Sequence, residues 1–95
     1  MGSKIVLVGD QGSEHEGFHP SPIIAGSPTV MIDGKPVARL GDPLAPHDKP
    51  KHSPHPRFIA QGAATIIADG KPVALSGHAV DCGGTVTGSA SGEGN

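Results

Sequence analysis

The sequence predicts an all-β fold built from three similar units, and two features lead to this prediction. The stretch 26–42 (GSPTVMIDGKPVARLGD) recurs as 62–78 (GAATIIADGKPVALSGH), with nine of the 17 aligned positions identical. Self-similarity at a fixed period, here 36 residues, is typical of repeat architectures. Each copy also joins two short extended runs through Asp-Gly, which favours a β-hairpin with a type I′ turn. No run of ten or more residues has the 3.6-residue periodicity of a helix.

The two ends of the chain resemble the two halves of a third unit. Residues 5–10 (IVLVGD) match the second half of the repeat at 36–42 (PVARLGD), and residues 84–89 (GTVTGS) resemble the first half at 23–27 (IIAGS). Two whole copies and one split copy therefore predict a ring of three units that is closed by pairing the chain ends.

The expected elements follow from β-branched runs and from clusters of Gly, Pro and polar residues. Asp10 and Asp42 are expected to cap the loops that they enter, and Phe18 and Phe58 to fill the core. His78 is expected to be exposed, with a place next to the metal ligands as the alternative. The single domain covers residues 1–95, ordered over about 4–89, with 90–95 as a flexible tail. Strands are expected at 4–8, 23–25, 29–32, 36–40, 58–61, 65–68 and 73–75, and loops at 9–22, 41–57 and 77–84.

Composition points to a domain with a thin core. Only 35% of the 95 residues are hydrophobic, whereas Gly and Pro number 15 and 10. Small domains of this kind usually need an additional crosslink for stability. A single cysteine excludes an intramolecular disulfide, so the crosslink expected is a metal ion. The net charge of −2 gives no reason to expect nucleic-acid binding. No signal peptide or membrane-spanning run is found, so synthesis in the cytoplasm is expected.

The histidines and the cysteine all fall in the three expected loops. His15 and His47 each lie five residues after the Asp of a Gly-Asp pair, and Cys82 lies four residues after His78, which stands at the third Asp position. A threefold ring would bring His15, His47 and Cys82 to one end, each from a different unit. Tetrahedral zinc takes four N or S ligands, and Cys with His is a common structural mix.

The fourth ligand has two candidates. The repeat alignment favours His55, whereas the longer second loop also allows His52. His19 is an alternate to His15. A closed set of three histidines and one cysteine predicts one structural zinc ion, because catalytic zinc keeps a position open for water. Iron is the alternative ion.

The repeated pattern GxxTxxxDGKPVAxxG, the His-rich loops and the closing Asp81–Gly84 (DCGG) resemble the PAAR (proline-alanine-alanine-arginine) repeat proteins over residues 4–89. The namesake tetrapeptide is represented by Pro36–Arg39 (PVAR) and by 72–75 (PVAL). His78, where the family usually has Asp, and His19, where close relatives often have Pro, depart from the pattern.

This resemblance implies a small cone of pseudo-threefold symmetry with zinc held by His and Cys near its tip. It implies that one copy sits on the blunt end of the trimeric VgrG spike of a type VI secretion system. There it would sharpen the spike, help to puncture target membranes, and recruit effector proteins from separate chains. It would be exported on the spike to the extracellular space or the target cell.

Two alternatives remain at this stage. One is the tip of a phage or related contractile tail spike, which is physically the same device. The other is a small zinc-dependent hydrolase or nuclease, which needs an open metal position and a general base; Glu14 and Glu16 flank His15. We predict a protein that is not an enzyme.

Overall fold

The structure, a computed structural model of the chain, describes residues 3–13, 18–49, 52–91 and 93–94. These residues form an all-β fold of ten short strands, as predicted. They contain no helix that is long and apolar enough to cross a membrane. The strands pair antiparallel in twos: β1 (Ser3–Lys4) with β10 (Glu93–Gly94), β2 (Gln11–Gly12) with β3 (Ser21–Pro22), β4 (Met31–Ile32) with β5 (Lys35–Pro36), β6 (Pro43–Lys49) with β7 (His52–Phe58), and β8 (Ala63–Ala68) with β9 (Lys71–Val73).

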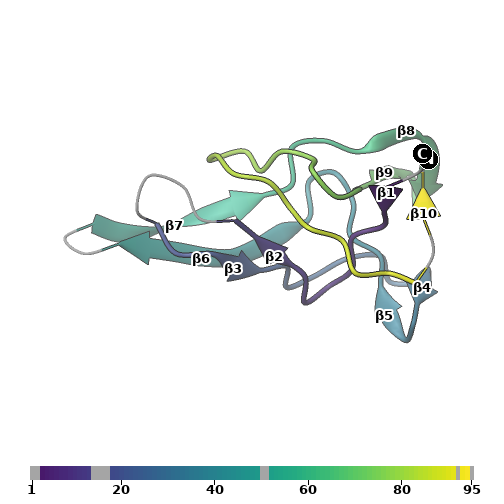
Figure 1. The fold of residues 1–95 in the computed structure, drawn as a ribbon, viewed down its shortest axis with the longest axis horizontal. Helices are drawn as coiled ribbons and strands as arrows, with labels where there is room; N and C mark the ends of the chain where they lie inside the picture. Colours follow the sequence, from purple (N-terminus) through teal and green to yellow (C-terminus); the bar gives the residue numbers. More distant parts are fainter. Residues whose placement is uncertain (1–2, 14–17, 50–51, 92, 95) are drawn as a thin grey trace.

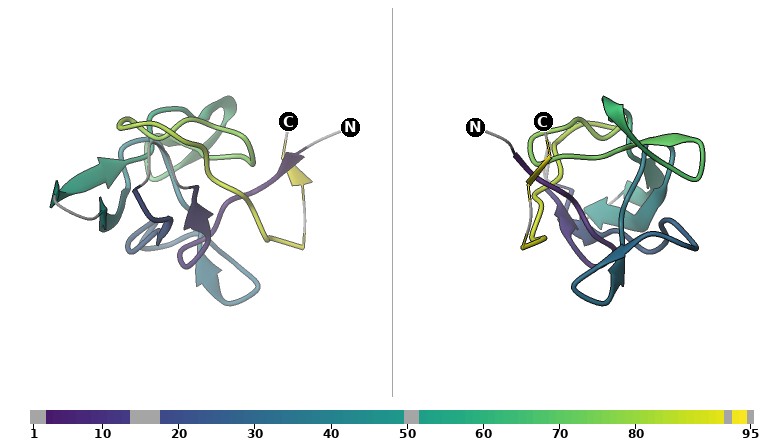
Figure 2. Two further views of the ribbon diagram at one scale, coloured as in Figure 1. Left: turned by 60° about the vertical axis from the view of Figure 1, so that its left-hand side comes forward. Right: turned by 90° about the vertical axis from the view of Figure 1, so that its right-hand side faces the viewer.

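The molecule is elongated, 40 × 27 × 21 Å, and its two ends differ (Figure 1). The pair β1–β10 and the hairpins β4–β5 and β8–β9 gather at the wide end, whereas β6–β7 extends toward the narrow end. Along the long axis, the three wide-end pairs lie at three corners around a centre (Figure 2, right). The wide end therefore carries one pair from each of three units.

A closed ring of backbone hydrogen bonds lies at the centre of this arrangement. The N–H of Val6 donates to the carbonyl of Ala74 at 3.0 Å, that of Ala74 to Ala38 at 2.9 Å, and that of Ala38 back to Val6 at 2.8 Å. All three side chains are fully buried. Each residue comes from a different unit, so the predicted threefold ring is confirmed.

The third unit is assembled from both chain ends, as expected. Val86 takes the place that Ile23 and Ile59 hold in the two whole repeats, because each accepts an equivalent backbone hydrogen bond from a glycine. The three bonds are Gly9 N–H to Ile23 O at 2.9 Å, Gly41 N–H to Ile59 O at 2.8 Å, and Gly77 N–H to Val86 O at 2.8 Å.

Both Asp-Gly hairpins have the predicted turns. The φ angles are +55° at Asp33 and +77° at Gly34, and +52° at Asp69 and +80° at Gly70. Positive φ at both central residues is what a type I′ turn requires. In β4–β5 the turn joins the directly paired Ile32 and Lys35.

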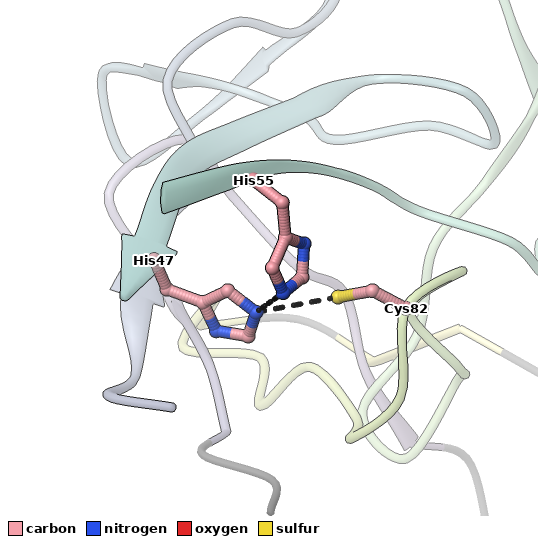
Figure 3. Close-up of side chains that lie close together, drawn as sticks. All are labelled: His47, His55 and Cys82. Atoms are coloured by element: carbon pink, nitrogen blue, oxygen red, sulfur yellow. Dashed lines mark hydrogen bonds between the residues drawn. The ribbon is translucent and has the colours of Figure 1, made fainter. Parts of the chain in front are cut away.

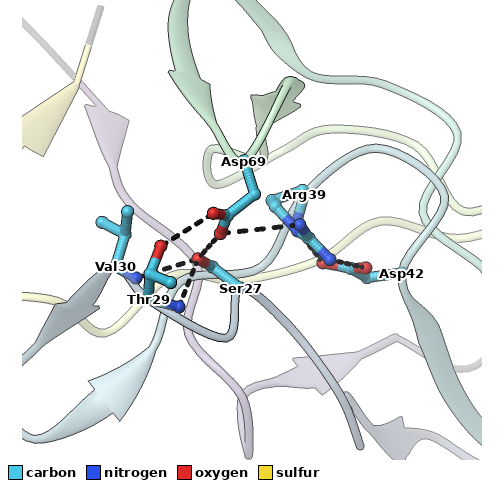
Figure 4. A network of polar contacts seen from close by, with 6 residues as sticks. All are labelled: Ser27, Thr29, Val30, Arg39, Asp42 and Asp69. Carbon is cyan, nitrogen blue, oxygen red and sulfur yellow. Dashed lines mark hydrogen bonds and ion pairs between the residues drawn. The ribbon is translucent and has the colours of Figure 1, made fainter.

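Each hairpin aspartate is also tied to a neighbouring segment. Asp69 accepts hydrogen bonds from the hydroxyls of Ser27 and Thr29 (Figure 4), and the Ser27 bond, followed by the Thr29 bond, holds the pKa of Asp69 below its ordinary value. Asp33 accepts the N–H and hydroxyl of Ser91, both at 2.8 Å, and these bonds lower its pKa in the same way. The turns therefore link the units as well as closing the hairpins.

The longest hairpin, β6–β7, was expected to be a loop, and that expectation was wrong. His47 pairs directly with His55 in its register, which is interrupted by two irregularities. Its prolines favoured a loop, because proline cannot donate to a ladder. Proline is nevertheless tolerated at the first residue of a strand and at bulges; Pro43 begins β6, and the register is irregular on both sides of His47.

The segment after Ser89, expected to be a flexible tail, makes contacts with the body. Ala90 is fully buried and its N–H donates to Ile5 O at 3.2 Å. β10 pairs with β1, placing Glu93 opposite Lys4. These contacts complete the third unit where the two ends of the chain meet.

The core consists of small aliphatic side chains in two clusters. Phe58 is 41% exposed and does not fill it, contrary to expectation. Its neighbours Arg57 and Ile59 are both buried, so the alternation of side chains along the strand turns Phe58 to the opposite, exposed side. The clusters are Val6, Ile23, Ala38, Leu44, Ile59, Ala74, Val80 and Val86, and Leu7, Val37, Ala68, Val73 and Ala90.

Candidate metal centre

Three of the predicted ligands, His47, His55 and Cys82, point toward one another (Figure 3). His47 on β6 and His55 on β7 are paired across the hairpin, and Cys82 comes from the turn after Val80. His47 Nε2 lies 3.0 Å from His55 Nε2 and 3.5 Å from Cys82 Sγ. One N or S atom of each residue lies within 4.8 Å of the others. The three therefore form a group that could hold a metal ion.

The Nδ1 atoms of the two rings face backbone carbonyls, and their Nε2 atoms face this group. His47 Nδ1 lies 3.0 Å from His19 O, and His55 Nδ1 lies 3.2 Å from Pro56 O. A carbonyl oxygen only accepts, so the tautomer protonated at Nδ1 suits both contacts and directs each Nε2 to the group. In this tautomer Nε2 is the atom that can serve as a metal ligand. The donor set thus fits a metal ion, and backbone contacts of this kind orient metal-binding histidines.

Phe18 covers the same rings. Its ring centroid lies 4.9 Å from that of His47 in a stacked arrangement and 4.6 Å from that of His55 edge-on. His47 is only 2% exposed. Phe18, expected in the core, instead shields the histidines from water, and a lower local polarity strengthens interactions among charged groups.

The other candidate ligands are described by the structure only in part or lie outside the described residues. His15 lies outside the described residues, as do Glu14 and Glu16. For His52, only its backbone place in β7 is described. His19 contributes its carbonyl to His47, and its ring is not among the three converging groups. The fourth ligand stays a prediction.

Arg57 is a residue of this region that the sequence reading missed. It is fully buried, and all five of its N–H donors have acceptors. Nε donates to Cys82 Sγ at 3.3 Å. The repeat alignment offers one signal, because Arg57 follows His55-Pro56 where Ser21 follows His19-Pro20. The other acceptors are Gly12 O at 3.2 Å and Ser21 Oγ at 3.1 Å for Nη1, and Ser13 O at 2.8 Å and Gly83 O at 3.2 Å for Nη2.

The turns that lead toward the site share one capping device, which confirms the expected roles of Asp10 and Asp42. His78 departs from the expectation of an exposed side chain, since its ring nitrogen replaces the carboxylate in the third unit. The capping bonds are Leu7 N–H to Asp10 Oδ2 at 2.8 Å, Arg39 N–H to Asp42 Oδ2 at 2.8 Å, and Leu75 N–H to His78 Nδ1 at 3.0 Å.

Together, the fold and the site define a class: a small all-β domain of threefold repeats with a His/Cys group near one end. A family model described as the PAAR motif matches residues 13–88. The chain therefore belongs to the PAAR-motif family, as its sequence indicated. A comparison with curated proteins gave no match.

Proposed function

We propose that this protein is the tip of a type VI secretion spike, with a structural rather than a catalytic role. One copy would cap the blunt end of a trimeric VgrG-like spike, with the metal centre pointing away from it. The family supports a spike-tip role in general. The observation that carries the finer proposal is the closed threefold ring of Val6, Ala38 and Ala74 within a single chain.

A single chain can match a trimer only if it presents three similar surfaces. The three corners of the wide end meet this requirement (Figure 2, right). Equivalent apolar side chains are exposed there, since Met31 on β4 and Ile67 on β8 are each 56% exposed. Short strands at this end would also offer backbone groups for pairing with the strands of a partner. We therefore assign docking to the wide end.

The proposed metal is one structural zinc ion held by His47, His55, Cys82 and His15, with His52 and His19 as alternates for His55 and His15. When bound, it supplies a crosslink between segments from different units. Such a crosslink stiffens a domain that has little core, because metal binding free energy becomes folding free energy. A rigid point is what a device that punctures a membrane requires.

Transient contact with a target membrane and export on the spike follow from this role. Effector proteins would attach to the complex as separate chains. No nucleic acid is part of the proposal.

Native mass spectrometry of the purified spike complex tests the proposal. We expect one chain per spike trimer, whereas three chains per trimer would rule out the threefold match. The double variant Met31→Asp/Ile67→Asp should lose the complex while remaining folded. Ile24→Asp is the matched control, because Ile24 is 54% exposed but hydrogen-bonds Pro43 at the start of β6. Retention of the complex by the double variant would contradict docking through the wide end.

A further inference from the structure

We propose that Arg57 is a positioning residue of the metal centre, which fixes the Cys82 sulfur through an N–H···S hydrogen bond and biases the site toward a divalent ion. This inference rests on the metal site proposed above. It concerns a residue that is not itself a ligand.

The geometry leaves Arg57 no freedom. Its Nε–H donates to Cys82 Sγ at 3.3 Å, and its two terminal nitrogens donate to three backbone carbonyls and the Ser21 hydroxyl. The guanidinium is a planar fork with five donors in fixed directions. Because the other four donors are held by acceptors at Gly12, Ser13 and Ser21 and at Gly83, the direction of the Nε–H bond to the sulfur is fixed as well.

The contact between Arg57 and Cys82 matters because the guanidinium carries a buried positive charge. Arg57 is fully buried, and a buried cation is costly unless an anion lies nearby. Of its five acceptors, only the Cys82 sulfur can carry a negative charge, which it does as the thiolate of a metal-bound cysteine. A buried guanidinium would therefore find its counter-ion in the metal ligand.

The repeat is broken at this level to make room for Arg57. Ser21, Arg57 and Gly84 each lie two residues before the equivalent core positions Ile23, Ile59 and Val86. A Cβ on Gly84 would lie 2.7 Å from Ser13 Oγ and 3.3 Å from Nη2 of Arg57, and one on Gly12 would overlap Leu44 Cδ2 and lie 3.0 Å from Nη1. The two glycines thus leave space that Arg57, Ser13 and Leu44 fill.

The expected consequence concerns the metal itself. A hydrogen bond from a cation withdraws electron density from the thiolate, and such bonds to ligating sulfur tune a metal centre. One thiolate with neutral imidazoles, set beside a fixed positive charge, disfavours a trivalent ion. The site should therefore prefer zinc or ferrous iron to ferric iron.

The first test uses the unchanged protein loaded with cadmium-113. A proton–cadmium correlation spectrum should show a cross-peak from the metal to the Hε of Arg57, carried through the Cys82 sulfur, beside the cross-peak to the Cys82 Hβ protons. If the Cys82 peak is present and the Arg57 peak is absent, the role of Arg57 is overturned. If the Cys82 peak is itself absent, the proposed metal site fails instead.

The second test compares Arg57→Lys with Arg39→Lys after loading with Co²⁺. Lysine keeps the positive charge but lacks the Nε–H that donates to Cys82 Sγ. Without this hydrogen bond the sulfur lone pair is less stabilised, so the sulfur-to-cobalt charge-transfer band should shift to lower energy in Arg57→Lys. Arg39 is another buried arginine, but it pairs with Asp42, so its variant should leave the band in place. An unshifted band in Arg57→Lys would overturn the proposal, and if that variant does not fold, the cadmium experiment decides.

Discussion

At the scale of single residues, the hairpin aspartates and the cysteine act through contacts that join distant parts of the chain. Asp69 receives two hydroxyls from the repeat before it, and Asp33 receives Ser91 from the closing segment. Cys82 meets two histidines from β6 and β7. Each contact is a bond between units rather than within one.

The first residue-scale prediction concerns the Asp69 carboxyl. Its folded-state pKa is lowered, chiefly by the hydroxyl of Ser27, so Ser27→Ala should raise that pKa toward the ordinary value. The lowered pKa also means that this carboxylate adds stability above the unfolded pKa, about 4, which is lost as pH falls through the lower folded value. NMR titration of the Asp69 side chain measures the shift.

The control for this titration is Ser53→Ala, which changes an exposed serine on β7. It should leave the Asp69 titration where it is. An Asp69 pKa that does not move in Ser27→Ala would show that the Ser27 bond is not its cause.

The second residue-scale prediction compares Cys82→Ser with His78→Ala. Loss of a structural metal should cost several kcal/mol of unfolding free energy, since such ions bind zinc-finger peptides with about 10–16 kcal/mol. His78→Ala removes one acceptor, that of Leu75 N–H, and should cost about 1 kcal/mol. Thermal and denaturant unfolding of the two variants, with metal content measured beside them, tests this order. Equal losses would argue against a metal that stabilises the fold.

At the scale of elements, each hairpin depends on the backbone conformation of its turn. The Asp-Gly pairs hold positive φ at both central residues, and this twist matches that of the flanking strands. β6–β7 lacks an Asp-Gly pair, and it is the hairpin that carries two candidate ligands into register. Local turn chemistry therefore sets the wide-end hairpins, whereas tertiary contacts hold the ligand hairpin.

Gly34→Val should destabilise the protein by about 1–3 kcal/mol, because a β-branched residue is strained at φ +77°. Nothing lies within 4 Å of the added Cβ, so the loss would report the backbone conformation and not a clash. Lys35→Val places the same side chain at the exposed next position and should change stability by less than about 0.5 kcal/mol. Equal melting temperatures for both variants would contradict the type I′ turn.

At the scale of the whole molecule, the backbone ring of Val6, Ala38 and Ala74 joins two ends that are stabilised by different kinds of contact. The wide end has paired strands and the second core cluster, whereas the narrow end has the His/Cys group, Phe18 and Arg57. We therefore expect rigidity at the narrow end to depend on these polar contacts and on the proposed metal ion, beside the first core cluster against which Cys82 packs.

Removal of the metal by a chelator should therefore loosen the two ends unequally. We expect backbone amides of β6 and β7 to exchange with solvent much faster, while amides of β4–β5 and β8–β9 change little. Hydrogen exchange followed by mass spectrometry measures this, and restoring zinc should reverse it. Equal acceleration throughout the chain would contradict local support by the metal.

The sequence by itself determined the all-β class, the threefold ring, the two Asp-Gly turns and the capping role of Asp10 and Asp42. These features depend either on a short local sequence, such as the Asp-Gly dipeptide, or on a stretch that occurs twice in the chain. They can therefore be recognised without the structure. The same alignment predicted His15, His47 and Cys82 as ligands, because equivalent positions in a ring meet at one end, and it favoured His55 as the fourth.

Only the tertiary structure decided the features that break the repeat. The β6–β7 hairpin was not predicted because both of its strands contain prolines, which usually disfavour the interior of a strand. Arg57 looks like a charged residue at the end of a loop, yet it is fully buried and finds its acceptors in two distant segments, at residues 12, 13 and 21 and at 82–83. Ala90 is buried because the two chain ends meet there. In each case the partners are far apart in sequence, and it is the closing of the ring that brings them into contact.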